Sequence, residues 1–149
     1  MNKDFAPYEE ALELKKLGFD EPCLGYWNID PYLPKPTFNL VKPFEHEWCL
    51  PAPLYQQAFR WFREKYQMIH QIYSLKYKGG VNYDYEIFSL VLPTDDELGN
   101  EDDVATDKSM ETYDSLVDKN FKHDESETYP EAELECLKKL IEIVKNNTL

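Results

Sequence analysis

The sequence predicts an α+β fold, in which three main helices pack on one face of a small antiparallel sheet of three to five strands. Three segments place apolar residues with the period of an α-helix, and each has a proline near its first turn. Shorter segments alternate apolar and polar residues, as half-buried strands do. Along the chain these elements follow the order α-β-β-α-β-β, an acidic insert, then α. This mixed order indicates an α+β layer.

The first predicted helix lies in PYEEALELKKLGF and starts near Pro7. Proline suits a first helical turn because its missing N–H would have no partner there and its φ is already helical. Gly18 follows the last turn, where a glycine can take the left-handed conformation that ends a helix. Phe19 is then placed to pack back on that turn.

The second predicted helix, YQQAFRWFREKY over residues 55–66, sets aromatic rings beside arginines, as surfaces that bind single-stranded nucleic acid do. At about 100° per residue, however, the rings and the guanidinium groups lie on opposite sides. The apolar side holds Leu54, Tyr55, Ala58, Phe59, Trp61, Phe62 and Tyr66, and the polar side holds Gln56, Gln57, Arg60, Arg63 and Glu64. A stacking platform needs both groups to meet on one ligand, so the pattern indicates an amphipathic helix that packs on a core.

The third predicted helix lies in TYPEAELECLKKLIEIV. Thr128 and Glu131 have the spacing of a capping box, in which each side chain accepts a hydrogen bond from the backbone N–H of the other residue. The side predicted to be buried holds Ala132, Leu134, Cys136, Leu137, Leu140, Ile141, Ile143 and Val144. A second amphipathic helix is therefore expected close to the C-terminus.

A β-hairpin is predicted where MIHQIYSLKY and VNYDYEIFSLVL flank Lys78, Gly79 and Gly80. The second of these segments alternates apolar with polar residues, and the two glycines permit the positive φ that a tight hairpin favours. Two shorter strands are expected in PCLGYW and EWCL, separated by a loop rich in proline.

Length and composition indicate one soluble domain over residues 1–149. The N-terminus has no apolar signal region, and no run approaches the roughly 18 apolar residues that span a bilayer. The three cysteines are an odd number at wide spacing, which is not typical of a secreted disulfide framework. We therefore expect a cytoplasmic protein that makes no membrane contact.

The net charge of −13 is concentrated in one segment. Residues 93–127 hold 13 acidic side chains and 3 lysines, whereas the rest of the chain has 16 acidic and 13 basic residues. A single acidic run is more typical of a solvated loop than of a folded surface, so we expect residues 93–127 to be a flexible insert within the domain. Acidity of this kind disfavours nucleic-acid binding, which depends on neutralising phosphates.

The sequence offers no convergent set of catalytic, cofactor-binding or metal-binding residues. Its three histidines, His46, His70 and His123, accompany no nucleophile motif. His46 and Cys49 form one ligand pair, where a structural zinc site has two. The many carboxylates leave a paired-carboxylate site open, but the sequence does not show which of them meet.

Three stretches, YEEALELKKLGFDEPC, PAPLYQQAFRWFREKY and YPEAELECLKKLIEIVK, together resemble a family of small proteins encoded by phages and prophages of gut bacteria. The likeness covers about 45 of the 149 residues in a fixed order. The chain departs from the family at Leu54, where threonine is usual, and its acidic stretch is longer. No activity is established for that family, so the resemblance implies a small cytoplasmic phage or prophage protein and assigns no functional residue.

These observations predict a non-enzymatic protein-interaction module whose partner is a host or phage protein. The candidate contact residues are Tyr83, Tyr85, Asp95, Asp96, Glu101, Asp102 and Asp103. Tyrosine offers a large contact area at small entropic cost, although the two tyrosines could instead face the helices. Two other functions stay open: a small metal-dependent hydrolase or nuclease that uses carboxylates, and an acidic DNA mimic that acts against host defence.

Overall fold

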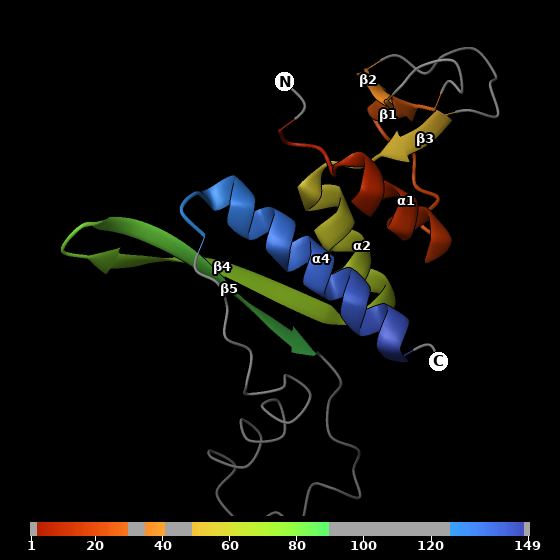
Figure 1. Ribbon diagram of the computed structural model, residues 1–149. Helices are drawn as coiled ribbons and strands as arrows, with labels where there is room; N and C mark the ends of the chain where they lie inside the picture. The colour runs from red at the N-terminus through yellow and green to blue at the C-terminus, as the bar shows by residue number, and fades with distance from the viewer. Residues whose placement is uncertain (1–2, 30–34, 41–48, 90–125, 148–149) are drawn as a thin grey trace, which may run out of the picture.

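The computed structural model describes residues 3–29, 35–40, 49–89 and 126–147 (Figure 1). In this part of the chain the elements, in order, are α1 (Tyr8–Lys16), β1 (Gly25–Asn28), β2 (Thr37–Asn39), β3 (Cys49–Ala52), α2 (Tyr55–Tyr66), β4 (Met68–Tyr77), β5 (Gly80–Ser89) and α4 (Tyr129–Asn147). The α+β class and the three predicted helices are confirmed. Most of the acidic segment, including all five acidic candidates for partner contact, lies outside the described residues.

The strands form two separate antiparallel sheets in the described chain, where the sequence predicted one. One sheet has the order β2-β1-β3 and the other is the β4-β5 hairpin. The first sheet contacts α1 through β3, whereas the hairpin contacts α2 and α4. Helices therefore lie between the two sheets (Figure 1).

The three-stranded sheet is short and rich in aromatic rings. Trp27 of β1 is paired with Phe38 of β2 on one side and with Leu50 of β3 on the other. The sequence did not predict β2, because three residues inside a proline-rich loop are too few to show a periodicity. Gly25 allows the sheet to close, since a Cβ at this position would lie 2.7 Å from the Phe38 ring and 2.8 Å from the Phe5 ring.

The hairpin has the predicted position but a different turn. Tyr77 pairs with Gly80, so Lys78 and Gly79 form the turn and Gly80 is already a strand residue. The expected positive φ at the two hairpin glycines was wrong, since positive φ values in the described chain occur at Gly18 and Gln67. The turn end of the hairpin extends beyond the helices (Figure 1).

The core lies where α2, α4 and the hairpin meet. Phe62 of α2 and Leu137 and Leu140 of α4 are at most 1 % exposed. The predicted apolar sides of α2 and α4 are confirmed for most of their residues: Tyr55, Ala58, Phe59 and Trp61 of α2 and Ala132, Cys136, Ile141 and Val144 of α4 are buried as well, whereas Leu54, Tyr66, Leu134 and Ile143 are partly buried. Residues of α2 and α4 thus share one cluster with residues of the hairpin.

Both predicted helix ends have the expected hydrogen bonds. Gly18 has a φ of 91°, and the N–H groups of Gly18 and Phe19 donate to the carbonyls of Lys15 (3.0 Å) and Leu14 (2.9 Å). This is the Schellman pattern. At α4, the Thr128 N–H donates to Glu131 Oε2 (3.1 Å) and the Glu131 N–H donates to Thr128 Oγ1 (3.4 Å), which completes the capping box.

Replacing Gly18 tests the α1 cap. Gly18→Ala should lower the free energy of unfolding by about 1 kcal/mol, because an alanine at a φ of 91° is strained. Urea unfolding followed by circular dichroism measures the change. Gly79→Ala is the matched control, since its φ is not positive and a Cβ there would meet no atom within 4 Å. An equal loss in both variants would contradict the assigned role of Gly18.

Candidate functional site

The structure places the two candidate tyrosines of the hairpin in different surroundings. Tyr85 is 9 % exposed and belongs to the core cluster, so its ring is not available to a partner. Tyr83 is half-buried, and its ring packs edge-on against Tyr129 with centroids 5.8 Å apart. Its backbone also exchanges two hydrogen bonds with Ser126. Tyr85 therefore packs toward the helices, as the alternative interpretation expected, and we no longer count Tyr85 as a contact residue.

A groove beside α2 combines charged side chains with exposed apolar side chains. Its volume is about 620 Å³. We call it the α2 groove; its lining comes from α2, the start of β4, the segment before β1 and the first turns of α4: Leu24, Leu54, Gln56, Gln57, Phe59, Arg60, Arg63, His70, Tyr129 and Glu133. It brings together residues that are more than 100 positions apart in the sequence.

The polar side of α2 supplies most hydrogen-bond donors of the groove. Gln56, Arg60 and Arg63 are exposed and follow at i, i+4 and i+7, which places them on one side of the helix. Arg60 donates to Glu21 at 2.7 Å, and its Nε lies 3.9 Å from Glu64. Arg63 forms no ion pair with another residue in the described ranges. Its guanidinium is thus open to an acceptor from outside.

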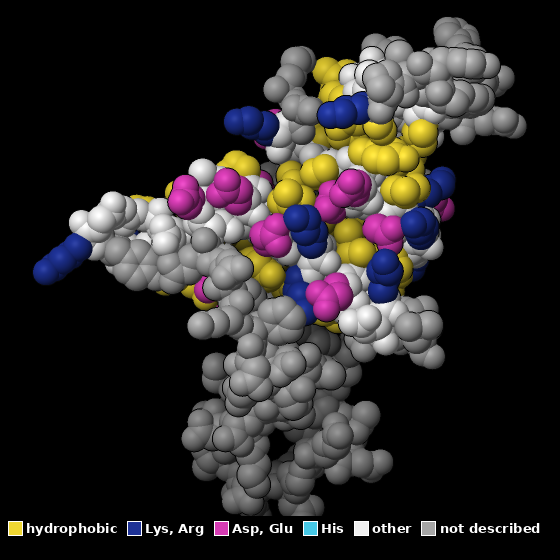
Figure 2. All heavy atoms as spheres, in the orientation of Figure 1, with side chains coloured by type: hydrophobic (Ala, Val, Ile, Leu, Met, Phe, Trp, Pro, Cys, Tyr) yellow, Lys and Arg dark blue, Asp and Glu magenta, His cyan; other side chains and the backbone are white. Residues whose placement is uncertain are grey.

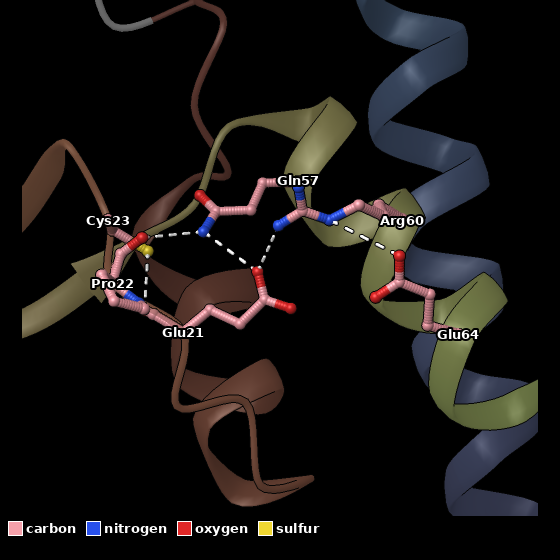
Figure 3. A network of polar contacts seen from close by, with 6 residues as sticks. All are labelled: Glu21, Pro22, Cys23, Gln57, Arg60 and Glu64. Atoms are coloured by element: carbon pink, nitrogen blue, oxygen red, sulfur yellow. Dashed lines mark hydrogen bonds and ion pairs between the residues drawn. The ribbon is translucent and has the colours of Figure 1, made fainter.

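A polar network holds the segment before β1 against α2 (Figure 3). The Gln57 side-chain amide donates to the carbonyl of Pro22 (2.9 Å) and to Glu21 Oε2 (3.3 Å), the carboxylate oxygen that also accepts from Arg60. The pair of Arg60 and Glu21 is partly exposed, so it contributes to position more than to stability. The network therefore positions the segment that carries Leu24 at the α2 groove.

Two of the most exposed large apolar side chains in the described chain line this groove. Leu24 is 69 % exposed and Tyr129 is 45 % exposed. Leu54 lies beside them at the start of α2, and Phe59 is buried and forms the base. Exposed apolar surface next to open donors is a common property of interaction sites.

His70 is held as a structural residue at the edge of the groove. Its ring stacks on Phe59 with centroids 3.7 Å apart. Burial, and secondarily the positive charge of Arg63, lowers its pKa below the ordinary value of 6.5. The imidazole is therefore neutral at neutral pH and adds a hydrogen-bonding group without a charge.

Glu133 introduces the opposite charge from α4. Burial, with a smaller effect of the nearby carboxylate of Asp4, raises its pKa. One acid with a raised pKa and one histidine with a lowered pKa thus line the same groove. Burial is the main cause of both shifts, so they do not by themselves indicate catalysis.

Two of the cysteines, Cys23 and Cys136, do not have the properties of nucleophiles. Burial raises the pKa of the Cys23 thiol to about 11 and that of Cys136 to about 12. Both are therefore protonated at neutral pH, whereas a reactive cysteine is a thiolate. Cys49 lies in β3, and His46, its candidate partner for metal binding, lies outside the described residues. Where the structure describes the chain, no three His, Cys, Asp or Glu residues cluster as metal ligands would.

The surface over α4 and α1 is charged but carries both signs. Figure 2 shows acidic and basic side chains interspersed there. The ion pairs on this face join Glu135 to Lys138, Glu142 to Lys139, and Glu13 to Lys145 and Lys16. The hollow on this face is lined by Glu9, Glu10, Leu12, Glu13, Lys138 and Ile141 and holds none of the exposed large apolar side chains of the described chain, so the α2 groove is the better candidate.

Comparison of the chain with models of protein families, with curated proteins and with solved structures gave no match. In the described ranges, the helices are all too short or too polar to cross a membrane.

The sequence pattern predicted some of the residues that line the α2 groove. It identified Arg60 and Arg63 as the polar side of α2, which the structure confirms. It missed Leu24 and Tyr129, because a leucine in a predicted strand and a tyrosine at a helix start carry no sign of exposure. Only the contact of their segments with α2 and α4 shows that they share a groove.

The lowered pKa of His70 predicts a pH dependence. The unfolded state binds the proton at a higher pH than the folded state, so the contribution of neutral His70 is complete above the unfolded pKa of about 6.5 and is lost as the pH falls toward the folded pKa. His70→Phe keeps a ring on Phe59 and cannot titrate. Urea unfolding at pH 7.5 and 5.5 should show a larger loss of stability for the native chain than for His70→Phe. Equal losses would contradict the assignment.

Proposed function

We propose that this chain is a non-enzymatic protein-interaction module, a phage or prophage accessory protein that binds a host or phage protein in the cytoplasm. The resemblance of three stretches of the sequence to phage and prophage proteins supports the origin. The α2 groove supports the binding role, and the observation that carries it is the placement of exposed Leu24 and Tyr129 beside the open donors of Arg63.

The groove has the composition of a protein-binding surface more than of an enzyme cleft. Interfaces combine an apolar centre rich in tyrosine with arginine, and these are the residue types present here. A small-molecule site buries most of its ligand. Leu24, at 69 % exposure, is too open for that kind of enclosure.

The two alternative functions, a metal-dependent hydrolase or nuclease and a DNA mimic, each require a specific arrangement of carboxylates. A metal-dependent hydrolase needs paired carboxylates in a cleft, whereas Glu133 is the one carboxylate in the lining of the α2 groove. A DNA mimic needs carboxylates at phosphate-like spacing, and those of residues 93–127 fall almost entirely outside the described residues. The groove therefore favours the interaction module.

Substitution of Leu24 tests the proposal. Purified tagged protein is used to capture partners from a bacterial lysate, and bound proteins are compared by quantitative mass spectrometry between the native chain and Leu24→Asp. A specific partner should fall by about tenfold or more with Leu24→Asp, because a charge replaces an apolar contact. The fold should be retained, since substitutions of exposed residues usually change stability by about 0.5 kcal/mol or less.

Lys78→Glu is the matched control, because Lys78 is exposed in the hairpin turn, away from the groove. It should capture the same partner as the native chain. A chain without residues 94–127 tests the acidic segment in the same experiment. A partner that binds Leu24→Asp fully but depends on residues 94–127 would refute the groove as the binding surface, and no specific partner in any lane would refute the interaction role.

A further inference from the structure

We infer that the α2 groove recognises an acidic segment of a partner protein, one that carries an apolar side chain close to its carboxylates. This inference rests on the proposed interaction role and adds the chemistry of the partner. It follows from the donors on α2, from the exposed apolar residues beside them and from the position of Glu133.

The arginines of α2 provide the anion-binding part. Arg63 has no ion pair within the described chain, so its planar guanidinium can donate two parallel hydrogen bonds to one carboxylate. Arg60 is held by Glu21 at 2.7 Å and presents its remaining donors from a fixed position. Exposed Gln56 adds an amide on the same side of the helix. No other part of the groove lining carries an arginine or lysine.

The apolar residues and Glu133 determine how such a segment lies. Leu24 and Tyr129 offer an apolar contact, so a purely acidic ligand would leave them exposed. Glu133 comes from α4, and its carboxylate would repel another carboxylate placed beside it. The acidic residues of the partner therefore lie along α2, and its apolar side chain lies against Leu24 and Tyr129.

Local charge matters more here than the net charge of the chain. At physiological ionic strength the Debye length is about 8 Å, so a segment in the groove responds mainly to the groups that line it. Most of the acidic excess comes from residues 93–127. Nucleic acid is a less suitable ligand, because its affinity depends on several cations that neutralise phosphates, and this groove holds two arginines, one of them paired with Glu21.

Selection from a random peptide library tests the inference. Displayed peptides of about twelve residues are selected on the full-length protein at near-physiological salt, with Arg63→Glu protein as the parallel selection. Peptides enriched on the native protein should contain Asp or Glu within a few positions of Leu, Ile, Phe or Trp. Synthetic copies, measured by fluorescence anisotropy, should bind Arg63→Glu about tenfold or more weakly, because the substitution turns attraction into repulsion.

Two control variants separate local from general effects. Lys78→Glu makes the same change of charge outside the groove and should leave the dissociation constant within about twofold. Arg63→Gln removes the charge without reversing it and should give an intermediate loss; it also tests Arg63 if the Glu variant does not fold. The inference would be overturned if the enriched peptides were basic or purely apolar. It would also be overturned if they bound the Arg63 variants as tightly as the native protein, or if no peptide were enriched on the native protein.

The two proposals fail in distinguishable ways. If a lysate partner is lost with Leu24→Asp while the selected peptides lack acidic residues, the interaction role stands and the chemistry of the partner is wrong. Single-stranded DNA that competes with the selected peptides at the same concentration would instead assign the groove to phosphates.

Discussion

The structure depends on the burial of the aromatic side of α2. Phe59, Trp61 and Phe62 are each at most 6 % exposed, and the helix contacts both α4 and β4. Fully burying a large apolar side chain contributes roughly 1.5–3 kcal/mol, so these three rings are a large part of the stability of a chain of this size. Both ends of the helix are fixed as well, by buried Pro53 and by Gln67 in a left-handed conformation that leads directly into β4.

The position of the arginines follows from that burial. A helix that buries its rings must turn its other side outward, and Arg60 and Arg63 lie on this side. Hydrogen bonds from Gln57 and Arg60 to Glu21 and Pro22 then bring the loop after α1 onto α2. Leu24 becomes exposed at the edge of the groove because its neighbours are held there.

Several residues with reactive side chains serve packing in this fold. Cys136 is fully buried in α4, and His70 is stacked on Phe59. Burial keeps both uncharged at neutral pH, which agrees with their positions beside apolar neighbours. The groups that the α2 groove offers to a partner include the guanidinium of Arg63, the amide of Gln56 and the apolar side chains of Leu24 and Tyr129.

The sequence by itself determined the local structure: the helices, the Gly18 cap, the Thr128 capping box and the strands of the hairpin. These features depend on neighbours within a few residues, so a periodicity or a cap motif reveals them. It did not determine that the strands form two sheets or that β2 exists, because pairing between distant segments decides these. It also did not determine that Gly80 has extended backbone, since this depends on which residues of the hairpin form the turn. The residues of the α2 groove were likewise predictable only in part. Arg60 and Arg63 follow from the helical pattern, whereas their meeting with Leu24 and Tyr129 was decided by the tertiary packing of α2 against α4 and by the Glu21 network.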